Sequence, residues 1–256
     1  MPPFARHLPV AALLAALTSQ PVMAQPAPAT PSGESTLSAG LMTTSEWRPY
    51  RGVGNTTSLF PLLQYENAWL DIWGPGADIK LKDDGPLAVM LRARYADTGY
   101  DASDSEALAG MKDRKNSVWL GTKLQWRTTV AHTSLEWLAD GSRHSKGQQA
   151  KLWVETMMHA GPVRIVPRAG LQWQDAKYVD YHFGVTAAEA TATRPAYRGH
   201  SVLNTELGAR FLYAFTPSQS GFVDLSATAL GSAIRRSPIV ERSWVPAVRA
   251  GYVYRF

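Results

Sequence analysis

The chain ends on WVPAVRAGYVYRF (residues 244–256), a stretch in which two kinds of residue alternate. One set is aromatic and apolar, namely Trp244, Pro246, Val248, Ala250, Tyr252, Tyr254 and Phe256. The other holds two arginines and small residues, namely Val245, Ala247, Arg249, Gly251, Val253 and Arg255. A period of two is that of a β-strand, whose successive side chains point to opposite faces. The stretch therefore predicts a strand with one apolar face.

The same alternation recurs along the chain between turn signals. Eleven candidate strands follow from it, near 36–44, 59–65, 68–82, 86–97, 115–126, 129–139, 149–159, 162–174, 201–216, 220–234 and 243–256. Most of them run to roughly 9–15 residues, which exceeds the 5–6 typical of soluble sheets and matches what a bilayer requires. No stretch after Ser35 has a convincing helical period.

The connections between these strands alternate in kind. Those at 127–129, 159–162 and 216–220 are tight, whereas 97–116, 140–148 and 175–199 are long and polar. Short turns at one end and long loops at the other are typical of an outer-membrane barrel. A closed sheet also satisfies every backbone N–H and C=O in hydrocarbon. The alternative is a large periplasmic β-sandwich, whose apolar faces would meet each other.

We therefore predict an all-β protein, a transmembrane antiparallel up-and-down β-barrel of about 12 strands (10–12) over residues 36–256. Both termini of such a barrel are expected in the periplasm, so the number of strands must be even. Because eleven candidates were found, one element is miscounted. The segment WGPGADIKLKDDG (73–85) is the expected place, since Gly74 and Pro75 can form a kink or a turn.

The N-terminal residues predict export. Arg6 and His7 precede an apolar run from Leu8 to Leu17 and a small-residue site at Val22 and Ala24, so residues 1–24 are predicted to be a cleaved signal peptide. A transmembrane anchor is the alternative, but the run is short for a span. Residues 25–35 are rich in Pro, Ser and Thr and are predicted to be a disordered periplasmic segment.

Composition limits the chemistry. The 256 residues contain no Cys, which excludes disulfides and thiolate metal sites. The formal charge of +5 is spread along the chain without a basic block, so no nucleic-acid partner is expected.

No catalytic, cofactor or metal site is predicted. The neighbours His200 and Ser201 would point to opposite faces of a strand, and the six His residues lack metal-ligand spacing. A weak divalent-cation site at Asp101, Asp104 and Glu106 is an alternative to a solvated loop.

Charged residues follow the polar faces of the predicted strands and are expected to line the lumen. They are Arg92, Arg94, Lys123, Arg127, Glu136, Lys151, Glu155, Arg164, Arg168, Glu206, Arg210, Arg249 and, at the chain end, Arg255. Two interpretations are open. The charges form a salt-bridged interior that holds the barrel round, or the excess of cations makes an anion-favouring passage.

Several stretches together resemble the MipA/OmpV family, the MltA-interacting proteins of the outer membrane. The stretches are RPYRGVGN (48–55), SLFPLLQYENAWLDIW (58–73), YVDYHFGVTAAEA (178–190), RPAYRG (194–199), RRSPIV (235–240) and GYVYRF (251–256). The resemblance covers the chain from about residue 38. One departure is His182, where the family often has a second aromatic residue.

The resemblance implies a non-enzymatic outer-membrane scaffold that links a peptidoglycan lytic transglycosylase to a bifunctional penicillin-binding synthase. A small-solute, anion-favouring channel and an adhesin or surface-recognition barrel are the alternatives. Outer-membrane lipid and lipopolysaccharide would surround the wall, and the barrel assembly machinery would read Phe256 as a C-terminal signal.

Residues that match the family motifs are expected to pack the long loops together near the outer rim. They are Tyr50, Gly52, Tyr181, Phe183, Gly184, Tyr197, Ser237 and Pro238. We expect Gly184 to take a positive φ, which glycine adopts at little cost.

Overall fold

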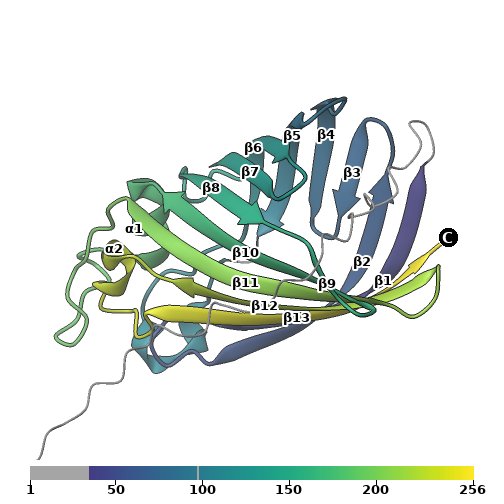
Figure 1. The fold of residues 1–256 in the computed structure, drawn as a ribbon. Coiled ribbons are helices and arrows are strands. Elements are labelled where there is room, and N and C mark those ends of the chain that lie inside the picture. The colour runs from purple at the N-terminus through teal and green to yellow at the C-terminus, as the bar shows by residue number, and fades with distance from the viewer. Residues whose placement is uncertain (1–34, 97) are drawn as a thin grey trace, which may run out of the picture. The chain divides into compact units, whose positions relative to one another are not determined.

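The computed structural model describes residues 35–96 and 98–256, which form one antiparallel sheet that closes on itself (Figure 1). Neighbouring strands along the chain pair with each other throughout most of the sheet, and the ring closes where β1 pairs with β13 and β10 with β11. The predicted antiparallel barrel is confirmed.

The strands alternate with turns and loops, and two short α-helices and two 3₁₀ turns lie in the loops. The strands are β1 (Thr36–Trp47), β2 (Asn55–Glu66), β3 (Leu70–Trp73), β4 (Gly76–Lys82), β5 (Leu87–Ala96), β6 (Ser117–Arg127), β7 (His132–Asp140), β8 (Gln148–Glu155), β9 (Met158–Ala160), β10 (Val163–Gln174), β11 (Val202–Ala214), β12 (Gln219–Ala229) and β13 (Trp244–Arg255). The helical elements are η1 (Ala102–Asp104), η2 (Glu106–Leu108), α1 (Ala176–Phe183) and α2 (Ser232–Arg235).

The thirteen labelled strands correspond to a barrel of twelve strands. Both β8 and β9 pair with β10, so they count as one strand of the barrel that is interrupted after Glu155. The candidate strand 68–82 is instead a hairpin of β3 and β4, turned at Gly74, whose φ is +53°. The expected miscount therefore lies where Gly74 and Pro75 indicated it, and the expectation of twelve strands is confirmed.

The alternation in sequence becomes two faces of the wall. Large apolar side chains are exposed on the outer face, among them Leu59 (68% exposed) and Trp126 (59%). Charged side chains occupy the opposite, inner face and form ion pairs between strands that are not neighbours, such as Arg92 of β5 with Glu136 of β7. Since the backbone is paired within the sheet along most of the wall, the outer face can contact hydrocarbon.

The two ends of the barrel differ. The turn end carries both chain ends of the described barrel and the tight turns, and the loop end carries the helical elements (Figure 1). At the turn end, Phe256 donates its N–H to the carbonyl of Leu37 (3.0 Å), and its side chain is exposed.

Two helices were not expected from the sequence. In α1, the side chain of Asp175 accepts a hydrogen bond from the N–H of Tyr178 (2.8 Å) and caps the helix. With eight residues, α1 is too short to show a helical period. The strand predicted to reach residue 234 ends at Ala229, and α2 follows it.

Within the described part of the chain, no helix has the length and apolar character that a membrane span requires. The predicted signal peptide at 1–24 lies outside the described residues, as does the segment 25–35 except for its last residue.

Candidate functional site: a capped lumen

The connections at the loop end pack into a hydrophobic core, which we call the lid. Its buried side chains come from the β1–β2, β5–β6, β10–β11 and β12–β13 connections and from the adjoining strand ends: Tyr50, Tyr100, Leu108, Met111, Trp119, Leu138, Tyr178, Val179, Phe183, Val185, Val202, Ala233, Ile234, Ile239 and Val240. Burial raises the pKa of Tyr178 to about 12, although Arg94 nearby favours its ionised form. The lid is therefore a packed structure and not a set of independent loops.

Two buried arginines bind the polar backbone of the lid. Arg114 forms an ion pair with Glu189 (3.1 Å). Arg194 donates to the carbonyl oxygens of Ala107, Ala109 and Glu189. Each arginine thus joins the β5–β6 connection to the β10–β11 connection. Burial alone would raise the pKa of Glu189, but hydrogen bonds from backbone N–H groups, a hydroxyl hydrogen bond and Arg114 lower it to about 2.

The motif residues of the β1–β2 connection lie in this lid. The Tyr50 ring is buried, with its centroid 4.7 Å from that of Tyr100 and 5.6 Å from that of Phe183. Gly52 has a φ of +72° and donates its N–H to the carboxylate of Glu241 (3.2 Å). The β1–β2 connection is thereby fixed to three others that follow it in the chain.

The other motif residues form hydrogen bonds between different connections of the loop end. Ser237 donates its hydroxyl to the carbonyl of Phe183 (2.6 Å), and Tyr197 donates to that of Ala233 (2.5 Å). The Tyr181 hydroxyl accepts the N–H of Lys115 (2.8 Å). The carbonyl of Pro238 accepts the side chain of Arg51 (3.3 Å).

The expectation of a positive φ at Gly184 is wrong, because its φ is −72°. A side chain is excluded there for another reason. A Cβ at Gly184 would lie 2.2 Å from the carbonyl oxygen of Asp180. The same oxygen accepts a hydrogen bond from the N–H of Gly184. The glycine is required for close backbone approach at the end of α1.

His182 is buried in the lid among aromatic rings, 4.5 Å from the ring of Tyr178 and 4.9 Å from that of Tyr181. Neither ring nitrogen has a hydrogen-bond partner among the described residues. Burial, together with the positive charge of Arg114, lowers the pKa of His182 to about 3. The imidazole is therefore neutral and packs as an aromatic ring.

Below the lid, ion pairs cross the lumen, and we call them the charged belt. On one side of it, the carboxylate of Asp78 binds Arg92 (2.6 Å) and Lys123 (3.3 Å). Arg92 also binds Glu136, which in turn accepts Arg94 (3.2 Å). Four strands, β4 to β7, are joined by this group.

The other side of the charged belt is centred on Asp224, which is 1% exposed. Its carboxylate binds Arg168 (2.6 Å), Arg210 (2.9 Å) and, more distantly, Arg249 (3.6 Å). Lys151 binds Glu206 (3.0 Å), and its ammonium group lies 4.1 Å from the centre of the Trp153 ring. The side from β8 to β13 is joined in this way.

Four predicted lumen residues remain. Arg255 is exposed at the turn end and donates to the carbonyl of Pro217 (2.9 Å). Arg127 binds Asp83 near the turn end. Glu155 and Arg164 are half-buried and form no ion pair within the described part of the chain. The sequence analysis missed Asp78 and Asp224, the two most central carboxylates. The alternation of β12 could have revealed Asp224, because Val223 and Leu225 on either side of it belong to the apolar outer face. Asp78 lies in the miscounted segment.

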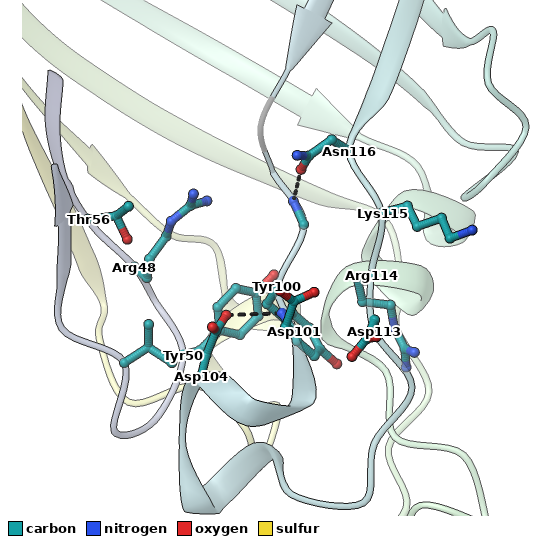
Figure 2. A pocket seen from close by; sticks show the side chains of 12 residues that line it. Arg48, Tyr50, Thr56, Tyr100, Asp101, Asp104, Asp113, Arg114, Lys115 and Asn116 are labelled. Atoms are coloured by element: carbon teal, nitrogen blue, oxygen red, sulfur yellow. Dashed lines mark hydrogen bonds between the residues drawn. The ribbon is translucent and has the colours of Figure 1, made fainter. Parts of the chain in front are cut away.

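Two cavities adjoin these groups. One of about 240 Å³ lies in the lumen under the lid and is lined by Tyr178, Lys151 and Glu206, among others. The second, of about 500 Å³, lies between the β1–β2 and β5–β6 connections (Figure 2). Both are lined by Arg48 and Tyr50.

No group of three or more His, Asp or Glu side chains suited to a metal ion occurs within residues 35–96 and 98–256. Asp101 and Asp104 are engaged with the backbone of η1 in a capping box. Asp101 and Asp104 thus serve local structure.

The fold, the apolar outer face and the polar interior define a transmembrane β-barrel of the outer-membrane class. The family described as "MltA-interacting protein MipA" matches residues 37–256, and the chain belongs to this family. A relative named MltA-interacting protein, from Escherichia coli, is 24% identical over 218 residues, which are 81% of this chain and 85% of that one.

The outer membrane protein Omp26La of Vibrio anguillarum is 31% identical over 157 residues, and OmpV of Vibrio cholerae is 30% identical over the same length. The match spans 61% of this chain and 61% of each of these two relatives. Among solved structures, the KdgM porin is similar with a TM-score of 0.40 and 10% identity, over 87% of this chain and 99% of that chain.

Proposed function

We propose that the protein is a non-enzymatic scaffold of the outer membrane that holds a lytic transglycosylase of the MltA type, together with a bifunctional penicillin-binding synthase. The lid and its buried core carry this proposal, because they close the loop end with packed side chains and leave the turn end as the accessible face. Membership of a family described as MltA-interacting supports the choice of partner.

The orientation is part of the proposal. Both termini and the turn end lie in the periplasm, and the loop end faces outward. The periplasmic partner then meets the tight turns. An exposed apolar group lies there, formed by Val130 (77% exposed), Met157 and Met158. Thr156 fixes this group by donating its hydroxyl to the carbonyl of Val130 (2.6 Å).

Retention of the transglycosylase on the immobilised, purified barrel tests this function. We expect binding by the wild type and a several-fold loss in Val130→Asp, because a charge is placed in the apolar group. Thr216→Asp, at another tight turn, is the matched control. Absence of retention by the wild type at low salt would remove the scaffold proposal.

The second candidate is an anion-favouring channel, for which the lumenal cavity and the cations around it are the supporting observation. The charged belt weighs against it, since most of these cations are paired with carboxylates. Planar-bilayer conductance distinguishes the two. A current that Arg168→Glu changes in ion selectivity would favour the channel, whereas a silent barrel favours the scaffold. Surface recognition is the third candidate. Binding of the barrel to a host or other surface that is abolished by deletion of the loops at the loop end would indicate it.

Phe256 has a separate proposed role as the handle for the assembly machinery. Its ring is exposed and contacts that of Tyr254 (5.1 Å between centroids). Deleting Phe256 is expected to lower the membrane yield and to leave the fold of the inserted protein unchanged.

A further inference from the structure

The barrel wall is incompletely paired between β2 and β5. The β3–β4 hairpin fills the space between these strands only near the turn end. On the β2 side its tip reaches Leu63, whose carbonyl accepts the N–H of Gly74 (2.9 Å). On the β5 side it reaches Tyr95, whose N–H binds the carbonyl of Pro75 (3.0 Å). Among the described residues, 55–62 of β2 therefore have a pairing partner only in β1.

This unpaired edge has a defined chemistry. The carbonyl of Leu63 points toward β3, and in a strand the N–H and C=O groups of every second residue point to the same side. The backbone groups of Asn55, Thr57, Leu59 and Pro61 therefore point to that side as well. On the strand edge away from β1, these four residues present three N–H groups and four carbonyls with no partner within the described residues. At a rise of about 3.3 Å per residue, the edge is about 26 Å long. Pro61 fits here, because its missing N–H lies on the free side.

Loops frame the gap on its remaining sides. The β1–β2 connection is tied to η2 of the β5–β6 connection through Ser105, which donates its hydroxyl to the carbonyl of Arg51 (2.8 Å). Arg48 and Thr56 lie on one side of the 500 Å³ cavity, and Lys115 and Asn116 on the other (Figure 2). The cavity thus occupies a window in the wall rather than a closed pocket.

The alternation of apolar and polar residues fails in β2 beside this window. Residues 59–63 read LFPLL and are apolar on both faces. On the inner face, Leu62 is 1% exposed and packs with Met42 and Val253, whereas Phe60 remains 42% exposed. The lipid-facing surface of the barrel therefore continues around the free edge of β2 into the lumen.

We infer that this is a lateral window into which a membrane lipid with a phosphate-bearing head group inserts, its acyl chain lying against Phe60. A bare strand edge cannot face hydrocarbon, since each unsatisfied backbone group there costs free energy. A head group with its water satisfies the edge, and phosphate oxygens accept the N–H groups of β2. Lys115 is the cation that we assign to the phosphate, because it lines the cavity, is exposed and forms no ion pair within the described residues. Arg48, Arg114 and the carboxylates of Asp101, Asp104 and Asp113 line the same cavity. This inference is independent of the scaffold role and requires only the barrel.

Single cysteines test the acyl-chain contact, because the chain has none of its own. Phe60→Cys, Leu120→Cys and Ser134→Cys are labelled with bimane in vesicles that contain phosphatidylglycerol brominated in mid-chain. Leu120 lies on the outer face, and Ser134 shares the inner face of β7 with Glu136. Each variant is first required to show the heat-shifted gel mobility of a folded barrel. If Phe60→Cys does not fold, Ser58→Cys, the next inner position of β2, replaces it.

Quenching at position 60 is expected to approach that at position 120 and to exceed that at position 134 several-fold. Equal, weak quenching at 60 and 134, with both open to aqueous iodide, would overturn the window. Protection of position 60 from iodide only after an envelope extract is added would indicate a partner strand and overturn the lipid. Lys115→Gln is expected to weaken quenching at position 60 by roughly fivefold and to spare position 120. An unchanged signal would overturn the assignment of the head group.

Discussion

The lid and the charged belt lie next to each other and are stabilised in opposite ways. The lid excludes water by packing apolar side chains from four connections. The belt keeps charges inside a closed sheet by pairing each central carboxylate with two or three cations. Truncating a lid residue leaves a cavity, whereas removing a belt carboxylate takes the main partner from several lumenal cations at once. The second change is therefore expected to cost more.

The largest effect is expected for Asp224→Ala. Arg168, Arg210 and Arg249 would lose their common partner in the lumen, at a cost of about 3–5 kcal/mol in the free energy of unfolding. Urea unfolding in lipid vesicles measures it. Ser226→Ala, on the same face of β12, is the control. A loss no larger than that of the control would show that water in the lumen solvates these arginines.

Leu108→Ala is expected to cost about 3 kcal/mol, because this side chain is fully buried in the lid core. The loss should be local. Amide hydrogen exchange should accelerate in the loop-end connections and stay unchanged in the wall strands. Acceleration throughout the wall would mean that the lid and the barrel unfold as one unit, and the comparison of two regions would fail.

The next effect depends on pH. His182 has a pKa of about 3 in the folded lid, against about 6.5 when exposed, so the unfolded chain binds a proton first as the pH falls. Its contribution to lid stability is complete above pH 6.5 and is lost progressively toward pH 3. Between pH 6.5 and 5 the loss is about 2 kcal/mol. Glu189, with a pKa of about 2, stabilises the fold fully above about pH 4.5, and it adds to the pH dependence only below that pH, where its contribution is lost.

His182→Phe, which restores the second aromatic residue of the family pattern, should remove this slope between pH 6.5 and 5. Hydrogen exchange of the lid amides at the two pH values measures it. A slope that persists in His182→Phe would assign the pH dependence to another group.

The smallest effect is expected for Arg127→Gln. The ion pair of Arg127 with Asp83 lies near the turn end with both side chains partly exposed, so solvent screens it. Its loss should cost less than about 1 kcal/mol in the same urea assay. A cost equal to that of Asp224→Ala would show that exposure does not set the strength of the lumenal ion pairs.

Much of the barrel could be predicted from the sequence, because a wall that separates lipid from a polar lumen imposes alternation residue by residue. Strand β6 shows this, with Leu120, Thr122, Leu124 and Trp126 on one face and Lys123 on the other. The prediction failed where local geometry replaced alternation. Gly74 turned one expected strand into two, and the cap at Asp175 began a helix in an expected loop.

The sequence by itself determined the class of protein, the outer face of the wall and the residue types available to the lumen, since these follow from a period of two. Only the tertiary structure decided which cations share Asp224, that eight scattered motif residues meet in one lid, and that residues 55–62 of β2 pair with β1 alone among the described residues. Those outcomes depend on register and on connections between distant segments. A local pattern in the sequence does not contain that information.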